Sequence, residues 1–315
     1  MFKNLTIHRA VLPEGIELST VEAALQTGVF TPCGATQDKS VGWVSPREAH
    51  GPLIESIGRE WIAAFMVEIK SVPGSAVQKK ADEAAAEIEA TQGRKPGRKE
   101  MKTLKEDALL ALLPTAHPKQ TRITVWIDRQ NKRLVADTVS QARLDDLSAA
   151  LVTAMPELQL SNLNTQIAPQ TAMTGWLATT NTADWPEGFA VERECELKSG
   201  DEEKSVVRYS RHHLLTEEVR NHLQQGKRPT RLAMSWEGRV AFTLTENLQL
   251  RKLAFLDGVF DGEADNDQDH FDADVAISTG ELHKLLPALI DALGGELMPG
   301  EFPRSEDKVE QGDPS

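Results

Sequence analysis

The sequence predicts an α+β protein in which β-rich segments flank a helical hairpin and a second α+β region follows. Two β-hairpin patterns support the β part, residues 123–127 with 134–136 and residues 231–236 with 239–244. In each pair, short apolar runs flank turn residues, as in antiparallel strands. The helical part rests on residues 73–113, which are rich in Ala, Glu and Lys. No Phe, Tyr or Trp occurs from position 66 to position 125.

The first 72 residues predict strands around one short helix. A strand is expected at residues 5–8, and Ser19 is expected to cap a helix that runs toward Gly28. Glu22, three residues after Ser19, completes a capping-box pattern. Residues 30–44 favour turns and short strands, and residues 61–72 form an apolar run typical of a strand buried on both faces.

Residues 73–113 predict two helices in a hairpin with a basic tip. Pro73 stands at the start of the first helix, and a break follows at Gly93 and at residues 96–97. The second helix is expected from about residue 99 to residue 113, ending at Pro114. Its apolar side chains recur at helical spacing and predict a core or interface stripe: Met101, Leu104, Ala108, Leu109, Leu112 and Leu113.

The second half predicts further helices and strands. A helix is expected at residues 143–155, and the polar stretch 156–169 favours a domain boundary. Another helix begins near Thr216, where two glutamates follow in the first turn and suit the positive end of the helix dipole. Strand 248–255 precedes the segment 261–274, which holds seven carboxylates and is expected to be a solvated loop.

Positive charge is segregated in an otherwise acidic chain. The protein has 48 Asp and Glu against 35 Lys and Arg, a net charge of −13. Residues 94–133 contain eleven basic and four acidic residues, a net of +7, and residues 204–233 contain seven and two, a net of +5. A polyanion would be attracted to these two blocks and repelled elsewhere. The competing interpretation is that both blocks are ordinary solvated surface.

Several classes of protein find no support in the sequence. No apolar run approaches the length of about 18 residues that a membrane helix needs, and the first 15 residues lack the apolar core of a secretory signal. We therefore expect a cytoplasmic protein without a membrane partner. There is no phosphate-binding loop and no nucleophile elbow, and two distant cysteines cannot form a disulfide framework. We expect no enzyme activity, no metal and no cofactor.

Two alternatives remain open at this stage. Glu194, Glu196 and Lys198 form an E-x-K triplet, which metal-dependent nucleases place on a strand, with Asp184 or Glu192 as a further acid. This alternative is a nuclease. The other alternative is a scaffold that binds a partner protein through the acidic faces and keeps that partner when the basic blocks are lost.

Short motifs across nearly the whole chain resemble the recombination-associated protein RdgC family of bacteria and some phages. They include FKNL at 2–5, FTPCG at 30–34, GWVSP at 42–46, LLP at 112–114 and WID at 126–128. The second half adds GF and ELK within 188–198, LTEEVRNHLQQGK at 215–227, FDADVAISTGEL at 271–282 and ALGGE at 292–296.

The resemblance implies a non-enzymatic protein that forms a ring-shaped homodimer around duplex DNA, with single-stranded DNA as a secondary ligand. It also implies binding without marked sequence preference, restraint of RecA-promoted strand exchange and association with the nucleoid. Residues 1–72 and 118–165 would form the central body, 73–117 the tip, 166–297 the base and 298–315 a disordered acidic tail. The residues expected to bind DNA are Arg94, Lys95, Arg98, Lys99, Lys102, Lys119, Arg122, Arg208, Arg211, His212, Lys227 and Arg228.

Overall fold

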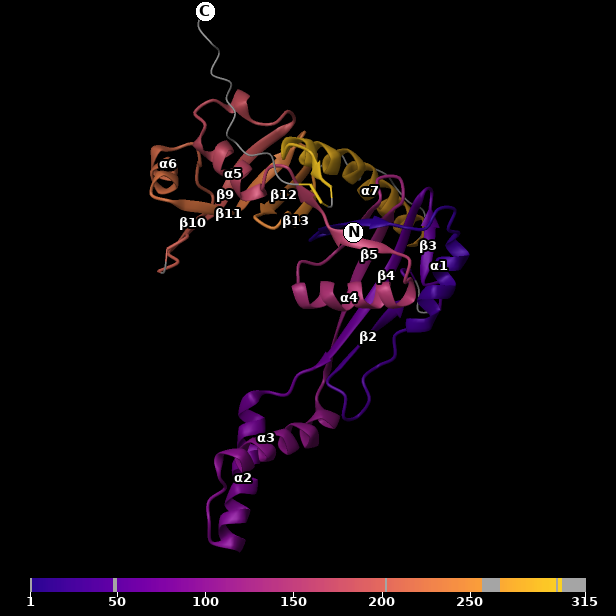
Figure 1. Cartoon of the computed structure of the whole chain (residues 1–315), viewed down its shortest axis with the longest axis vertical. Helices are drawn as coiled ribbons and strands as arrows, with labels where there is room; N and C mark the ends of the chain where they lie inside the picture. The colour runs from indigo at the N-terminus through magenta and orange to yellow at the C-terminus, as the bar shows by residue number, and fades with distance from the viewer. Residues whose placement is uncertain (1, 48–49, 202, 257–266, 299, 302–315) are drawn as a thin grey trace, which may run out of the picture.

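The computed structural model describes residues 2–47, 50–201, 203–256, 267–298 and 300–301; of residues 267–269 it describes the backbone alone. The chain is a mixed α/β protein whose sheets pair antiparallel throughout the described strands. Figure 1 shows an arc, with one sheet in the middle, a helical hairpin at one end and a second sheet at the other. The predicted α+β class is confirmed.

The central sheet has seven strands in the order β2-β4-β5-β6-β1-β7, with β3 paired to β4. Its core strands β4 and β5 pair along their whole lengths, from Trp61 opposite Ile127 to Lys70 opposite Pro118. The strands are β1 Thr6–Val11, β2 Lys39–Val44, β3 Ile54–Ile57, β4 Glu60–Lys70, β5 Pro118–Asp128, β6 Arg133–Ala136 and β7 Gln159–Asn162.

One face of the central sheet is covered by α1 (Leu18–Leu25) and α4 (Gln141–Ala154). The predicted capping box at Ser19 is wrong, because α1 begins at Leu18 and its N-cap residue, Glu17, makes no side-chain cap. The Glu22 carboxylate instead accepts hydrogen bonds from the backbone N–H groups of residues 53 and 54, at 2.8 and 3.0 Å. A long-range contact therefore replaces the local one that the motif predicts.

The predicted helical hairpin is present, as α2 (Gly74–Gln92) and α3 (Arg98–Leu112). It lies between β4 and β5 in the sequence, so it extends from the end of the strand pair (Figure 1). Gly93 ends α2 in the left-handed conformation, with φ 67°, where glycine carries no steric penalty. Within the two helices only Ala81 and Ala108 are buried.

The second sheet, which we call the base sheet, has five strands in the order β10-β9-β11-β12-β13. Helices α5 (Pro169–Ala178) and α6 (Glu217–Gln224) pack against β11. As predicted, α6 begins next to Thr216 with two glutamates in its first turn. The Thr216 hydroxyl caps the helix by accepting from the Val219 N–H at 3.4 Å. The strands are β9 Phe189–Ser199, β10 Val206–Tyr209, β11 Lys227–Trp236, β12 Val240–Thr245 and β13 Leu250–Phe255.

Helix α7 (Asp267–Ala292) connects the two sheets. Figure 1 shows it extending from the central sheet to the base, and its buried leucines share one apolar cluster with Trp126 of β5 and Leu232 of β11. The expectation of a loop at 261–274 is wrong from Asp267 onward, because that part is the start of α7. Residues 261–266 and 302–315, which include most of the expected tail, lie outside the described residues.

The smaller elements complete the chain. Leu5 bridges to Leu250, so the N-terminal segment is joined to the base sheet. Among the described residues, no helix is both long and apolar enough to cross a membrane. The remaining elements are a two-stranded pair, β8 Asn164–Thr165 with β14 Glu296–Leu297, and three 3-10 turns, Gln26–Gly28, Leu113–Thr115 and Thr182–Asp184.

Candidate nucleic-acid interface

The hairpin displays the first group of expected DNA-binding residues on its free end. Arg94 and Lys95 lie in the turn between α2 and α3, and α3 carries the other three, all exposed: Arg98, Lys99 and Lys102. Arg94 contacts Glu100 at 2.7 Å, which raises the arginine pKa and lowers the glutamate pKa.

The other ion pairs of the hairpin are longer. Lys95 lies 3.9 Å from Glu89, and Lys102 lies 3.7 Å from Glu106. Such exposed pairs stabilise a protein little, so a phosphate can replace either carboxylate at small cost. Arg98 and Lys99 have no acidic partner within ion-pair distance among the described residues.

The central sheet contributes Lys119 and Arg122, both on β5, but the structure separates them. Odd-numbered residues of β5 such as Ile123 face the cluster under α4, whereas even-numbered ones such as Trp126 face α7. Lys119 and Arg122 therefore point to opposite faces of the sheet, since successive strand residues alternate. The Arg122 guanidinium donates to the backbone carbonyl of Ser45 at 2.5 Å.

The base sheet displays the most organised basic surface. Arg208 on β10 lies opposite Glu196 on β9, and Arg228 on β11 lies opposite Lys198 on β9. Their neighbour Leu197 is buried on the other side, against the cluster that includes α5 and α6. We call the solvent-facing side of this sheet the open face. In Figure 1 α5 and α6 lie on the outer side of the sheet, which turns the open face toward the inside of the arc.

Three expected base residues lie away from the open face. Lys227 is half-buried and points to the side opposite Arg228, because the two are adjacent in β11. Arg211 is exposed in the loop after β10, with φ 56°. His212 packs against Tyr209, with ring centroids 5.2 Å apart, and its Nδ1 is buried without a hydrogen-bond partner among the described residues.

Tyr209 is a part of the base core rather than a stacking platform. Only 8% of the residue is exposed, and its hydroxyl donates to Glu218 at 3.1 Å. Burial and that carboxylate raise the Tyr209 pKa to about 12. A base cannot stack on a ring that is covered in this way.

Sequence reasoning missed three cations of the open face. Arg231, Arg251 and Lys252 line the same cavity as Arg208. Arg231 reaches the open face because a bulge at residue 230 shifts the register between Arg228 and Arg231. The sequence contains no signal for a bulge there, so spacing alone places Arg231 on the wrong side.

The residues of the possible nuclease triplet share one face of β9, but their carboxylates are occupied. Glu194 accepts from Lys252 Nζ at 2.6 Å. Glu196 accepts from Arg208 Nε at 2.6 Å and from the Thr230 hydroxyl at 2.8 Å. Burial by itself raises the pKa of Glu196, but the two donors lower it overall.

The acids proposed to complete the nuclease triplet are also engaged elsewhere. Glu192 accepts from the Ser235 hydroxyl at 2.7 Å, and Asp184 accepts from the Thr179 hydroxyl at 2.6 Å. Asp184 belongs to the short turn before β9 rather than to the strand. Each carboxylate of this alternative therefore has a protein donor in the structure.

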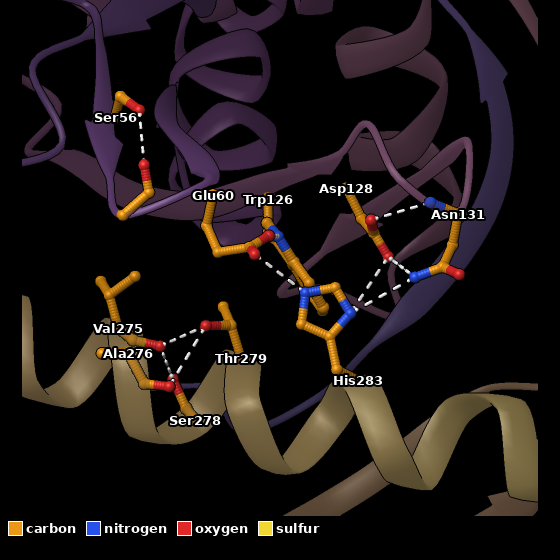
Figure 2. Close-up of polar contacts among 11 residues, drawn as sticks. Ser56, Glu60, Trp126, Asp128, Asn131, Val275, Ala276, Ser278, Thr279 and His283 are labelled. Atoms are coloured by element: carbon orange, nitrogen blue, oxygen red, sulfur yellow. Dashed lines mark hydrogen bonds and ion pairs between the residues drawn. The ribbon is translucent and has the colours of Figure 1, made fainter.

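Sequence patterns did not indicate a cluster of Glu60, Asp128 and His283, in which candidate ligand atoms lie within 4.8 Å of one another. Figure 2 shows His283 of α7 between the two carboxylates. Its Nε2 lies 2.9 Å from Glu60 and its Nδ1 lies 3.6 Å from Asp128, so the acids stand at different ring nitrogens. An ion bound to one nitrogen would face away from the carboxylate at the other.

The contacts of this cluster fit a structural role. Because a carboxylate only accepts, His283 Nε2 must carry a proton and donate to Glu60. Glu60 also accepts from the Trp126 indole N–H at 2.7 Å, and Asn131 donates to Asp128 at 2.7 Å. The cluster therefore joins α7 to the ends of β4 and β5 through satisfied hydrogen bonds.

The fold and this surface define an α/β protein with a helical hairpin between two paired strands and basic side chains on several elements. A family model described as "Putative exonuclease, RdgC" matches residues 1–296. The chain belongs to the RdgC family. It is 40% identical over 304 residues to the recombination-associated protein RdgC of Dechloromonas aromatica, covering 94% of this chain and 98% of the relative.

Two further relatives have the same name and the same coverage. The protein of Cupriavidus pinatubonensis is 41% identical over 298 residues, and that of Herminiimonas arsenicoxydans is 42% identical over 298 residues. Each alignment covers 94% of this chain and 98% of the relative. The resemblance inferred from short motifs is confirmed.

Proposed function

We propose that this protein binds duplex DNA without sequence preference through the basic residues of its hairpin and its open face. The observation that carries the proposal is the placement of exposed cations at both ends of one arc (Figure 1). Lysine and arginine neutralise phosphates and release counterions, which gives affinity that is independent of sequence and sensitive to salt. Single-stranded DNA would be a weaker ligand, because Tyr209 and Trp126 are buried.

In this proposal two copies close into a ring around the duplex. Two observations support the contact between copies: the arc is open on one side, and the hairpin exposes Leu109 and Leu110, which are 36% and 49% accessible. Both leucines lie at one end of the arc, and a contact between two copies there would cover them. Bound rings would occupy duplex that a RecA filament needs and would so restrain recombination. They would act on the nucleoid and would not alter the DNA chemically.

The decisive experiment compares closed circular with linear duplex of identical sequence, over a salt series and without divalent metal. We expect binding to both forms that falls steeply with salt, and slower release from the circle at high salt. Equal rates of release from the circular and the linear duplex would argue against a closed ring but leave DNA binding in place. Failure to bind either form at low salt would overturn the proposal.

A metal-dependent nuclease is the alternative function. It is favoured by the family model's description and by the common face of Glu194, Glu196 and Lys198 on β9. The ion pairs of both glutamates oppose it, since a metal would first have to displace Lys252 and Arg208. Nicking of plasmid that requires magnesium and disappears in Lys198→Ala would establish this alternative.

A further inference from the structure

The open face contains a cavity of about 420 Å³ with a mixed charge pattern. Its lining includes four cations, Arg208, Arg231, Arg251 and Lys252, and two carboxylates, Glu194 and Glu196. The cavity therefore keeps a positive excess although both acids lie inside it. A concave site with a positive excess and several fork-shaped guanidinium groups suits a phosphate better than a metal ion.

Glu196 occupies the centre of this arrangement. It stands on β9 between Arg208 of β10 and Arg231 of β11, which are its partners in the two neighbouring strands. Its carboxylate lies 2.6 Å from Arg208 Nε and 3.9 Å from Arg231 Nε, and only 15% of its side chain is accessible. The position of the carboxylate is fixed by the Thr230 hydroxyl at 2.8 Å.

The arginines of this group remain accessible even though Glu196 is covered. The Arg208 side chain is 74% exposed and that of Arg231 is 48% exposed. Each guanidinium therefore presents donors to solvent while one edge faces the carboxylate. Because both ion pairs have a solvent-exposed end, they are worth little by themselves, and an incoming anion can take the place of the carboxylate.

We propose that this cavity is a phosphodiester subsite in which Glu196 is an internal counter-ion that a DNA phosphate displaces from Arg208 and Arg231. The subsite rests on the DNA binding proposed above and adds to it an exchange of Glu196 for a DNA phosphate at the two arginines. In the free protein Glu196 partly neutralises the two arginines, which lowers affinity for DNA and holds both side chains in place. Removal of its charge should therefore strengthen binding.

The test measures binding of a duplex of about 30 base pairs by fluorescence anisotropy between roughly 50 and 300 mM salt. We expect Glu196→Gln to bind about 3- to 10-fold more tightly at the lowest salt. The slope of log K against log salt should become steeper by about 0.9, the value for one additional neutralised phosphate. In the double variant Glu196→Gln with Arg208→Gln the gain should disappear, because it depends on the released arginine.

The matched control is Glu281→Gln, which removes the same charge from a carboxylate that also lies 2.6 Å from an arginine, Arg239. That pair joins α7 to the turn before β12, outside the cavity. We expect its affinity and salt slope to equal those of the wild type. A gain as large as that of Glu196→Gln would mean that net charge alone matters, and it would overturn the subsite.

The outcomes separate the subsite from the function on which it rests. If the wild type binds DNA but Glu196→Gln binds no more tightly, the counter-ion role is wrong and DNA binding stands. If the wild type binds no DNA, the proposed function fails first. Arg208→Gln provides an independent test should Glu196→Gln misfold: its slope should be shallower by about 0.9, and an unchanged slope would overturn the subsite.

Discussion

The hairpin and the base sheet both display cations, but they hold these side chains by different physical means. In the described residues of the hairpin, each ion pair joins residues four or six positions apart, such as Arg94 with Glu100. In the base sheet, Arg208 meets Glu196 and Lys252 meets Glu194 across strands. The charge pattern of the hairpin is set by local sequence, whereas that of the base depends on tertiary structure.

The same difference holds for apolar packing. The helices of the hairpin bury two alanines, Ala81 and Ala108, whereas the base sheet shares a large cluster with α5, α6 and α7. A region with little buried surface tolerates substitution, because few contacts are lost. Surface changes in the hairpin should therefore leave the stability of a single copy nearly unchanged, whereas core changes in the base should lower it.

The largest expected effect tests this difference in packing. Leu232 of β11 is fully buried, so Leu232→Ala should lower the free energy of unfolding by about 2–5 kcal/mol, through lost apolar transfer and the cavity left behind. Leu110 of α3 is 49% exposed in a single copy, and Leu110→Ala should stay within about 0.5 kcal/mol of the wild type at a protein concentration low enough to keep copies apart. Denaturant unfolding at one protein concentration measures the free energy of both variants. Equal losses would mean that the hairpin and the base sheet do not differ in packing.

The second prediction tests the hairpin charges. Replacing Arg98, Lys99 and Lys102 by alanine should weaken duplex binding on the order of 100-fold at about 0.1 M salt and reduce the salt slope by about 2.7. The melting temperature should remain that of the wild type, because the three side chains are exposed. The matched control keeps the positive charges and swaps arginine and lysine at the same positions, as Arg98→Lys with Lys99→Arg and Lys102→Arg. It should bind as the wild type does, and an unchanged affinity in the alanine variant would remove the hairpin from the interface.

The hairpin could be predicted from the sequence because its determinants are local. Gly93 and Pro96 interrupt a helical pattern at a point where no other chain segment decides the structure. The start of α6 near Thr216 was predictable for the same reason, since its signal, two glutamates in the first turn, lies within the helix itself. Ser19 shows the limit of such motifs, because Glu22 bonds to the N–H groups of residues 53 and 54 instead.

The open face could be predicted only in part. Arg208 and Arg228 stood out as members of a basic block, but strand β10 is four residues long, too short to show a strand period in the sequence. The bulge at residue 230 and the pairing of Glu196 with two strands come from sheet register, which one sequence does not reveal. His283 and Glu60 are 223 positions apart, so only the fold brings them together.

The third prediction concerns acid stability and the ion pair between Arg239 and Glu281. The hydrogen bonds from Arg239 lower the pKa of Glu281. The stabilisation by the ionised carboxylate is therefore complete above the pKa of an unfolded glutamate, about 4.3, and it is lost as pH falls through the pKa that Glu281 has in the folded protein. Glu281→Gln should cost about 1 kcal/mol at pH 7, because the arginine end stays in water.

Unfolding of both proteins from pH 7 to pH 3 checks this prediction. The difference in unfolding free energy should shrink toward zero as the wild-type carboxylate is protonated. A difference that stays constant over this range would mean that the substitution acts through packing of α7 rather than through the charge. Arg94 and Glu100 form the corresponding pair in the hairpin, and Glu100→Gln should leave global stability unchanged at either pH, because this pair is local and exposed.

The smallest expected effects come from the two helix starts, which again differ between the regions. Thr216 caps α6 through its hydroxyl, but the contact is 3.4 Å long, so Thr216→Ala should lower stability by about 0.5 kcal/mol, the low end for a cap. Gly97 begins α3 without a side-chain cap, in extended backbone with φ −74° and with no atom near the position of an added Cβ. Gly97→Ser should therefore add a cap and stabilise α3 by a few tenths of a kcal/mol.

Hydrogen exchange is the measurement that resolves so small a change in one helix. In Gly97→Ser the first-turn amides of α3 should exchange more slowly, while those of the base sheet keep wild-type rates, because the hairpin shares little buried surface with the rest of the chain. In Thr216→Ala, protection should fall in α6 and also in β11, which packs against it. If the Gly97→Ser effect extended into the base sheet, the hairpin would be coupled to the core, and the difference between the two regions would be one of degree only.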